Sequence, residues 1–329
     1  MLRTYTAHHD CFRLNAPFRI SRGVKTTADV VTVTVMEGDH VGRGEGVPYP
    51  RYGETIDATV AELAAVRALV EAGATRGEIA TAMRAGAARN ALDAALWDLE
   101  ARHAGTSVAA LAGVAEPEPL ASAITIAIDT PDAMAARAAM LAHVPLLKIK
   151  VDRAGASAQI AAVRAAAPAP RLIVDPNESW TIETLRALDG ELAAHRVDLL
   201  EQPLPAGEDG ALAEIASTVP ICADESLHTA ADLPALRGRY DYVNVKLDKT
   251  GGLTEALALA TAARARGFGL MVGCMVCSSL GIAPALLIAR DATFVDLDGP
   301  LWLAEDRAGG VRDVDGVLHP PVPGFWGGH

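Results

Sequence analysis

Eight short apolar runs, spaced at near-regular intervals in the second two-thirds of the chain, constrain the fold more than any other feature. Helical segments such as 254–267 separate them. The runs lie at 122–128, 146–151, 171–175, 197–201, 220–224, 241–247, 269–273 and 293–298. Alternating strands and helices imply a parallel sheet, and eight units imply a closed barrel. The sequence therefore predicts an α/β fold with a (β/α)7β-type TIM barrel over 119–303.

The first third of the chain follows a different pattern. Residues 30–35 alternate in polarity as an antiparallel strand does, and a hairpin-like turn follows at 37–40. Alanine-rich helical runs cover 55–72 and 78–103. We expect an α+β capping domain over 1–118. The segment 304–329, which has Gly and Pro throughout, is expected to return to that domain.

Charge and composition exclude several classes of partner. A net charge of −12 argues against nucleic acid and against an anionic membrane surface. Gly, Ser and Pro interrupt the longest apolar stretch, 269–289, which predicts strand, loop and helix rather than a membrane span. The N-terminus has no apolar leader and the four cysteines are scattered, so a reduced cytoplasmic setting is expected.

Three acids end three neighbouring barrel strands: Asp175, Glu201 and Asp224. Active sites of such barrels lie at the C-terminal ends of the strands, so these side chains should converge. Like charges in close proximity resist burial unless a cation balances them. Carboxylate oxygens suit Mg²⁺, which predicts a magnesium site. Capping of the following helices is the alternative reading.

Lysines and acids on other strands complete the cluster. Lys148 and Lys150 lie two apart in the second strand, so they share one face. Lys246 lies in the sixth strand, which is opposite the second in an eight-stranded barrel. Asp296 and Asp298 share a face of the eighth strand. Lys150 and Lys246 should therefore approach one ligand from opposite sides.

This arrangement predicts a 1,1-proton transfer at a carbon next to a carboxylate. The metal and Lys148 would hold the substrate carboxylate and stabilise the enolate that forms when the α-proton leaves. One of the lysines Lys150 and Lys246 would remove the proton, and the other would return one to the opposite face. The configuration of that carbon would invert.

The same motifs carry a family resemblance. "KIK" (148–150), "DPNESW" (175–180), "EQP" (201–203), "ADES" (223–226) and "VKLDKTGG" (245–252) resemble the muconate-lactonising subgroup of the enolase superfamily. "DLDGP" (296–300) is similar to the Asp-x-Asp element of dipeptide epimerases. "FRISRGVK" (18–25), "GEGVPYPRYGET" (44–55) and "GCMVCSS" (273–279) resemble the bacterial L-Ala-D/L-Glu epimerases.

The resemblance implies roles for individual residues. Asp296 and Asp298 would hold a substrate ammonium, and Arg22 or Lys25, from cap loops, would meet the side-chain carboxylate of Glu. Further substrate contacts are implied for Thr125 and for the backbone of Cys274 and Val276. Asn177 is interpreted as a partner of the metal ligands, and Lys249 as a bystander at a turn. A small dipeptide, murein-peptide recycling and possible homo-oligomers are implied as well.

Other functions stay open at this point. o-Succinylbenzoate synthase, N-acylamino acid racemase and cycloisomerase would use the same half-reaction. An acylated amine, however, would give Asp296 and Asp298 no ammonium to hold. A metal-binding scaffold that has lost catalysis is a third reading, although every expected acid and lysine is present. The Cys274/Cys277 pair has C-x-x-C spacing but no redox or zinc context, so packing thiols are expected.

Overall fold

The computed structural model describes residues 3–328 and begins with a three-stranded antiparallel sheet of order β1-β2-β3. The strands are β1 (Arg3–Ile20), β2 (Gly23–Glu37) and β3 (His40–Gly46), and helices α1 (Ile56–Ala65), α2 (Arg67–Glu71), α3 (Arg76–Ala82), α4 (Ala87–Ala104) and α5 (Val108–Ala112) follow. Strand β3 packs directly on α4, where a Cβ added at Gly44 would lie 2.1 Å from the carbonyl oxygen of Ala91. Only glycine permits this approach.

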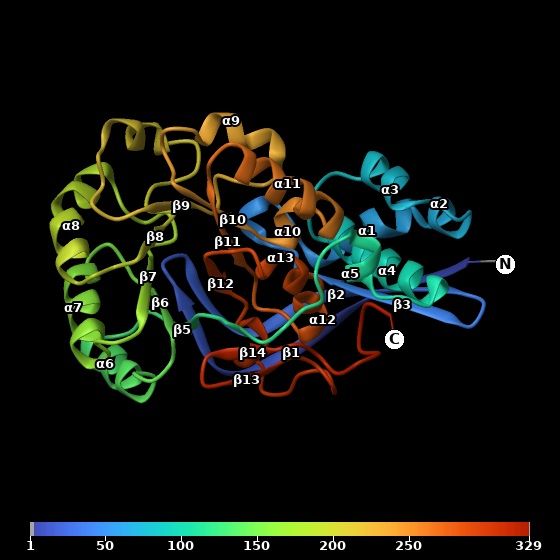
Figure 1. Cartoon of the computed structure of the whole chain (residues 1–329), viewed down its shortest axis with the longest axis horizontal. Coiled ribbons are helices and arrows are strands. Elements are labelled where there is room, and N and C mark those ends of the chain that lie inside the picture. Colours follow the sequence, from blue (N-terminus) through green and yellow to red (C-terminus); the bar gives the residue numbers. More distant parts are fainter. Residues whose placement is uncertain (1–2, 329) are drawn as a thin grey trace.

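The middle of the chain forms the expected parallel barrel (Figure 1). Its strand order is β12-β11-β10-β9-β8-β7-β6-β5, and the Ala123 N–H bonds the Val295 carbonyl at 2.8 Å across the seam. The predicted fold class is confirmed. The strands are β5 (Ile124–Ile126), β6 (Leu146–Lys150), β7 (Arg171–Asp175), β8 (Leu199–Glu201), β9 (Ile221–Ala223), β10 (Tyr242–Val245), β11 (Gly269–Gly273) and β12 (Phe294–Asp296).

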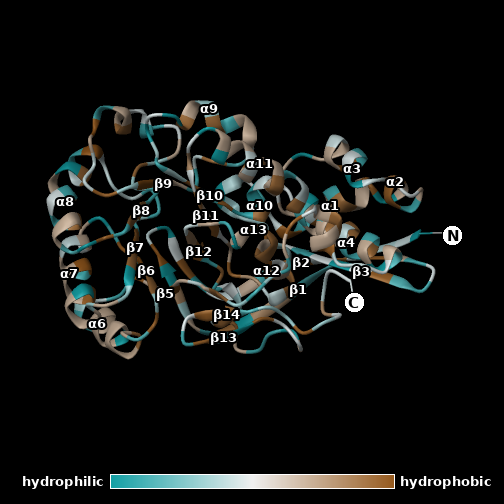
Figure 2. Ribbon diagram, viewed as in Figure 1, coloured by the Kyte–Doolittle hydropathy of each residue, from teal (hydrophilic) through white to brown (hydrophobic). Residues whose placement is uncertain are grey.

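Helices cover the outside of the barrel; the longer ones bury one face each, and two four-residue helices are buried throughout. Figure 2 shows hydrophilic and hydrophobic residues mixed around the outer helices, as this packing requires. They are α6 (Pro131–Met140), α7 (Ala156–Ala166), α8 (Ile182–Ala194), α9 (Leu233–Leu236), α10 (Leu247–Thr250), α11 (Leu253–Ala265), α12 (Ser279–Ile282) and α13 (Leu286–Ala289). A 3₁₀ turn, η2 (Asp209–Glu214), follows β8 in place of a long helix. No helix within residues 3–328 is long and apolar enough to cross a membrane.

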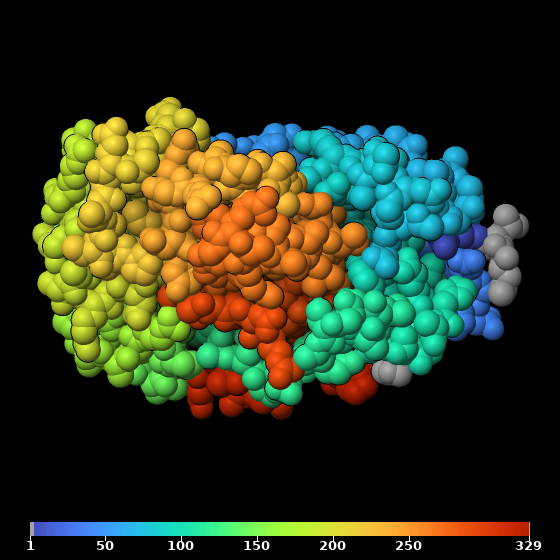
Figure 3. Space-filling model, turned by 45° about the horizontal axis from the view of Figure 1, so that its top comes forward, coloured from blue at the N-terminus to red at the C-terminus, as the bar shows by residue number. Residues whose placement is uncertain are grey.

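The last segment of the chain contacts both the barrel and the N-terminal sheet. Strand β14 (Val317–His319) pairs with β13 (Arg312–Val314) and with β4 (Leu120–Ala121). Farther along, the Trp326 indole donates to the Arg43 carbonyl at 3.0 Å, and the Gly327 N–H donates to Asp98 at 2.8 Å. Figure 3 shows the N-terminal helices lying against the barrel helices in one continuous surface. The domain boundaries at 118 and 303 stay a prediction.

Two details of the N-terminal region differ from expectation. The long strand β1, most of whose side chains are exposed or half-buried, was not expected. The predicted helical run over 78–103 is two helices, because α3 ends at Ala82 and Gly86, with φ 149°, precedes α4. The run over 55–72 is likewise divided between α1 and α2.

Candidate active site

A cavity of about 490 Å³ opens at the C-terminal ends of the barrel strands. Barrel side chains form its floor, and two segments of the N-terminal region, 18–25 and 49–52, form its roof. Most residues expected to act on a substrate line it: Arg22, Lys25, Thr125, Lys148, Lys150, Asn177, Asp224, Lys246, Cys274, Val276, Asp296 and Asp298. The chain thus gathers charged side chains from distant positions into one enclosed space.

The three acids at the strand ends are completely buried, and each meets a lysine. Asp175 Oδ2 lies 2.5 Å from Lys150 Nζ. Glu201 Oε2 lies 2.6 Å from Lys148 Nζ. Asp224 Oδ2 lies 2.6 Å from Lys246 Nζ. Each acid therefore has an ammonium partner that lines the cavity.

Burial and ion pairing act in opposite directions on these groups. Burial raises the pKa of Asp175, but the charges of Lys150 and Lys148 outweigh it and lower the value to about 2. Burial lowers the pKa of Lys246, but Asp224 and Glu201 raise it above the usual lysine value. In Glu201, burial and the charge of Asp175 together raise the pKa.

Lys150 and Lys246 stand on opposite sides of the barrel. Strand β6 carries Lys150 at its end, and Lys246 directly follows β10. Three strands separate β6 from β10 in the sheet order, which is half of an eight-stranded circle. Both ammonium groups line the same cavity, so a ligand between them would be accessible from two faces.

Lys249 was expected to be a bystander, and that prediction is wrong. Its side chain is only 1% exposed. Its ammonium donates to Asp224 Oδ1 at 2.6 Å and to the Asp224 carbonyl at 2.5 Å. A third bond reaches the Asn244 carbonyl at 3.0 Å. Side-chain direction within the short helix α10 determines this contact, and sequence spacing did not reveal it.

Asp296 and Asp298 form the end of the cavity nearest the barrel seam. Asp296 Oδ2 accepts from Lys148 Nζ at 2.7 Å, so Lys148 bridges this acid to Glu201. Asp298 Oδ2 accepts from the Thr125 backbone N–H at 2.8 Å. Burial and the charge of Asp296 raise the pKa of Asp298 to about 6. This end of the cavity is rich in carboxylates and suits a cationic group.

Two cationic side chains reach the cavity from the roof, but they differ in their partners. Arg22 forms ion pairs with Glu225 at 2.7 Å and Glu178 at 3.0 Å. Lys25 lies over the Tyr49 ring, 5.0 Å from its centroid, and forms no ion pair with any residue of the described chain 3–328. Burial lowers the pKa of Lys25. Lys25 is thus a half-buried cation at the cavity that has no ion pair within the described residues.

Sequence reasoning missed Glu225, which follows Asp224 in the "ADES" motif. Glu225 is buried and lines the cavity, where it accepts from Arg22. Burial and the neighbouring charge of Asp224 raise its pKa. Its place in the sequence, directly after the predicted metal ligand Asp224, was the available signal. Asn177 donates its backbone N–H to Asp175 at 2.8 Å and its side-chain amide to the same acid at 3.2 Å.

The loop after β11 lines the cavity with Cys274, Met275 and Val276. Cys277 is buried behind them among apolar side chains. A hydrogen bond with the Cys274 thiol, together with burial, raises the pKa of Cys277. A protonated, buried thiol of this kind is unreactive.

The donor set fits a hard divalent cation. Asp175, Glu201 and Asp224 supply three carboxylates from adjacent strands, as Mg²⁺ sites use. Among residues 3–328, no three His, Cys, Asp or Glu side chains stand in a ready-made metal cluster. The ammonium groups of Lys148, Lys150 and Lys246 each lie 2.5–2.6 Å from one oxygen of these carboxylates.

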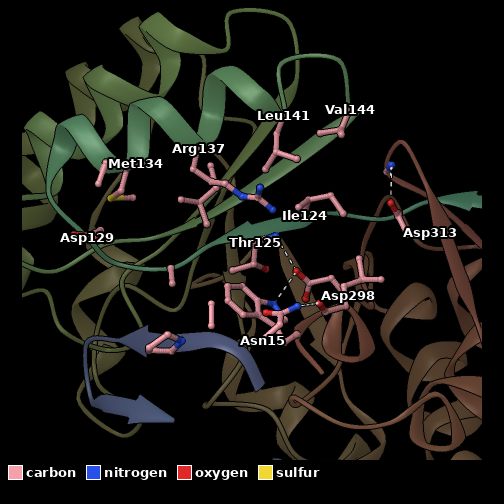
Figure 4. A pocket seen from close by; sticks show the side chains of 18 of the residues that line it. Asn15, Ile124, Thr125, Asp129, Met134, Arg137, Leu141, Val144, Asp298 and Asp313 are labelled. Atoms are coloured by element: carbon pink, nitrogen blue, oxygen red, sulfur yellow. Dashed lines mark hydrogen bonds between the residues drawn. The ribbon is translucent and has the colours of Figure 1, made fainter. Parts of the chain in front are cut away.

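A second cavity, of about 710 Å³, lies on the other side of Asp298 and Thr125 (Figure 4). Ile124, Met134 and Leu141 line it, and Arg137 reaches toward its interior in the figure. The hydrogen bond between the Thr125 N–H and Asp298 forms part of the wall between the two cavities. The carboxylate-rich end of the first cavity is therefore bounded by this wall.

Comparison with known proteins gives consistent matches over the whole chain. Residues 2–113 match the mandelate racemase / muconate lactonizing enzyme N-terminal domain, and residues 132–325 match the enolase C-terminal domain-like family. An L-Ala-D/L-Glu epimerase of Escherichia coli (strain K12) is 49% identical over 97% of this chain and 100% of its own length.

Two solved structures extend the comparison. An enolase family member from Agrobacterium tumefaciens, with homology to dipeptide epimerases and bound sodium and L-Ala-L-Glu, has a TM-score of 0.97 and 49% identity. The match covers 99% of this chain and 100% of that one. A dipeptide epimerase from Cytophaga hutchinsonii, in complex with Mg and D-Ala-L-Val, has a TM-score of 0.91 and 28% identity. It covers 99% of this chain and 95% of that one.

Proposed function

Because this chain belongs to the mandelate racemase / muconate lactonizing enzyme family of the enolase superfamily, we propose that it is an L-Ala-D/L-Glu epimerase. One observation carries the proposal: Lys150 and Lys246 face one cavity from opposite strands, with carboxylates at its Asp298 end and the Lys25 ammonium in its roof. A dipeptide with a free amine and an acidic second side chain matches both ends.

Three groups of residues would fix the dipeptide. Asp296 and Asp298 would accept hydrogen bonds from its ammonium, and Lys25 would pair with the side-chain carboxylate of its Glu residue. Lys148 would donate to the α-carboxylate, because its ammonium lies between the acid cluster and Asp296. Anchoring at three points places the Glu Cα between the two remaining lysines, which is the orientation that proton transfer needs.

Lys150 and Lys246 would exchange one proton for another on opposite faces of that carbon. A neutral lysine on one side takes the Cα proton and becomes an ammonium. The ammonium on the other side then donates a proton to the opposite face and becomes neutral. The Glu configuration inverts, and the two lysines have exchanged protonation states.

Asp175, Glu201 and Asp224 would hold Mg²⁺, which when bound stabilises negative charge on the substrate carboxylate. The residues of the roof would exclude water from the same space. Arg22 ties the roof to the barrel through Glu178 and Glu225, so the substrate is enclosed while its charge develops. Use of the reaction in murein-peptide recycling stays a prediction, as do a cytoplasmic setting and homo-oligomers.

Isotope exchange tests the proposed reaction. The purified protein with Mg²⁺ should incorporate deuterium at the Glu Cα of L-Ala-L-Glu in D₂O, as NMR and mass spectrometry would show, and should form L-Ala-D-Glu. Absence of exchange would refute the proposal. Lys150→Ala should abolish exchange from one epimer more than from the other, and Lys246→Ala should do the reverse. Equal losses for both epimers would contradict opposed bases.

The N-acylamino acid racemase alternative is separated by the substrate amine. A site with Asp296 and Asp298 at its end should prefer L-Ala-L-Glu over N-acetyl-L-glutamate, because only the dipeptide brings a cation to these acids. Higher kcat/KM for the acylated substrate would favour the alternative. o-Succinylbenzoate synthase and cycloisomerase activities are tested by the same substrate panel.

A further inference from the structure

Each proposed metal ligand has two carboxylate oxygens, and a cavity-lining lysine lies close to one of them. The other oxygen accepts a hydrogen bond from a different partner. Asp175 Oδ1 accepts from the Asn177 backbone N–H at 2.8 Å. Glu201 Oε1 accepts from the Asn244 amide at 2.8 Å. Asp224 Oδ1 accepts from the Lys249 ammonium at 2.6 Å. We call these three oxygens the outer oxygens. The mechanism above uses none of their partners.

The other oxygen of each acid, here called the inner oxygen, is the one that meets a cavity-lining ammonium. Asp175 Oδ2 meets Lys150 at 2.5 Å, and Asp224 Oδ2 meets Lys246 at 2.6 Å. Glu201 Oε2 meets Lys148 at 2.6 Å. Glu201 and Asp224 share this division, with one oxygen bonded by a residue outside the cavity lining and the other facing a cavity-lining ammonium. In Asp175, the inner oxygen also accepts from the Asn177 side-chain amide at 3.2 Å.

Lys249 is the strongest of the scaffold partners. Its three bonds, to Asp224 Oδ1, the Asp224 carbonyl and the Asn244 carbonyl, occupy all three donors of an ammonium group. It does not line the cavity, so it does not touch a substrate there. Lys249 is buried, all three of its N–H donors are used, and it does not line the cavity. It can therefore affect the site only through Asp224 and the Asn244 carbonyl, which accept its hydrogen bonds.

We infer that Lys249 and Asn244 are positioning residues that leave Asp224 and Glu201 one oxygen each for a metal ion. A backbone N–H holds Asp175 Oδ1. Three single oxygens suit Mg²⁺, which requires octahedral geometry and retains water or substrate oxygens at its other positions. Ca²⁺ favours six to eight ligands and often takes both oxygens of a carboxylate. The outer partners therefore select Mg²⁺ over Ca²⁺.

This inference rests on the proposed metal site, and ion binding without substrate tests it. Isothermal titration of the metal-free full-length protein with MgCl₂ and with CaCl₂ gives the ratio of the two dissociation constants. In Lys249→Met, Asp224 can turn and offer both oxygens, so Mg²⁺ affinity should fall by about tenfold or more while Ca²⁺ affinity falls less. The EPR spectrum of bound Mn²⁺ should change with it. Lys249→Arg should retain most of the Mg²⁺ preference.

Asn244→Ala should shift the ratio in the same direction, because it frees the outer oxygen of Glu201. It also provides the decisive test if Lys249→Met does not fold. Thr250→Val is the matched structural control, since Thr250 is buried in the same helix and its hydroxyl donates to the Leu247 and Gly252 carbonyls rather than to a proposed metal ligand. Its ratio should equal that of the wild type.

The outcomes separate the two hypotheses. If the wild-type protein binds no Mg²⁺, the proposed metal site itself is refuted. If the wild type binds Mg²⁺ but folded Lys249→Met or Asn244→Ala retains its ion ratio and Mn²⁺ spectrum, only the positioning role is refuted. A shift in Thr250→Val as large as that in Lys249→Met would also overturn it, because a general packing defect would then explain the effect.

Discussion

Replacing Lys25 by Met should remove the preference for an acidic second residue in the dipeptide. Lys25 lines the cavity beside Tyr49 and forms no ion pair within residues 3–328. Arg22, the other cation of the roof, is already balanced by Glu225 and Glu178. A carboxylate that enters this region therefore gains most from Lys25. The methionine side chain keeps the length and the apolar contacts but removes the charge.

The expected magnitude follows from a single buried ion pair. Two unit charges 4 Å apart interact by about 4 kcal/mol at an effective dielectric constant of 20, before either group loses its hydration. Net contributions of hydrogen bonds to charged groups are about 1.5–3 kcal/mol. The kcat/KM for L-Ala-L-Glu should therefore fall by roughly 10- to 150-fold in Lys25→Met. L-Ala-L-Gln, which has the same shape without the charge, should lose far less.

Initial rates for the two dipeptides in the wild type and in Lys25→Met give the ratio directly, with Arg22→Met as the comparison variant. An unchanged Glu/Gln ratio in Lys25→Met, or a larger change in Arg22→Met, would refute the reasoning. The pH dependence adds a second test. Burial lowers the pKa of Lys25, so the free enzyme loses this charge at lower pH than an ordinary lysine, whose pKa is about 10.4. The KM for L-Ala-L-Glu should rise as the pH increases through that pKa, whereas the KM for L-Ala-L-Gln should stay level.

Three other substitutions test separate parts of the structure. Asp298→Asn should lower kcat/KM about tenfold for L-Ala-L-Glu, with less effect on N-acetyl-L-glutamate, which steady-state assays would measure. Gly44→Ala should cost about 1–3 kcal/mol in urea unfolding, because its Cβ would clash with α4, whereas Gly190→Ala on α8, where a Cβ meets no atom within 4 Å, should not destabilise. Arg22→Met should speed amide hydrogen exchange in the roof segments 18–25 and 49–52 about tenfold, and unchanged exchange would show that its ion pairs do not hold the roof.

The barrel could be predicted because its signal is repeated. Each buried strand is a short apolar run. The runs are evenly spaced because a helix follows each strand and returns the chain to the end of the sheet where the next parallel strand begins. Because the sheet is parallel, Asp175, Glu201 and Asp224 had to lie at one end once their strands were placed. The opposition of Lys150 and Lys246 followed from counting strands around a closed sheet.

Features that depend on side-chain direction or on contacts between distant segments could not be predicted in this way. Strand β1 lacks a clear alternation because few of its residues are buried. Lys249 was misjudged because α10 is a single short turn whose four residues are all buried, so sequence spacing does not tell which of them meets the acid cluster. The ion pairs of Arg22 join residues more than 150 positions apart, and no local pattern records them.

The number of buried lysines is itself an argument for a bound cation. A two-base reaction needs only Lys150 and Lys246, yet the site also buries Lys148 and Lys249 against the same group of acids. Burial lowers the pKa values of Lys148 and Lys246, but the charges of the neighbouring carboxylates outweigh it and raise both above the ordinary lysine value, which favours the ammonium form. A lysine in this state cannot accept a proton from carbon. A lysine becomes neutral more readily when another positive charge stabilises the carboxylates in its place. Cation binding should therefore increase the ability of Lys150 and Lys246 to accept a proton from the substrate.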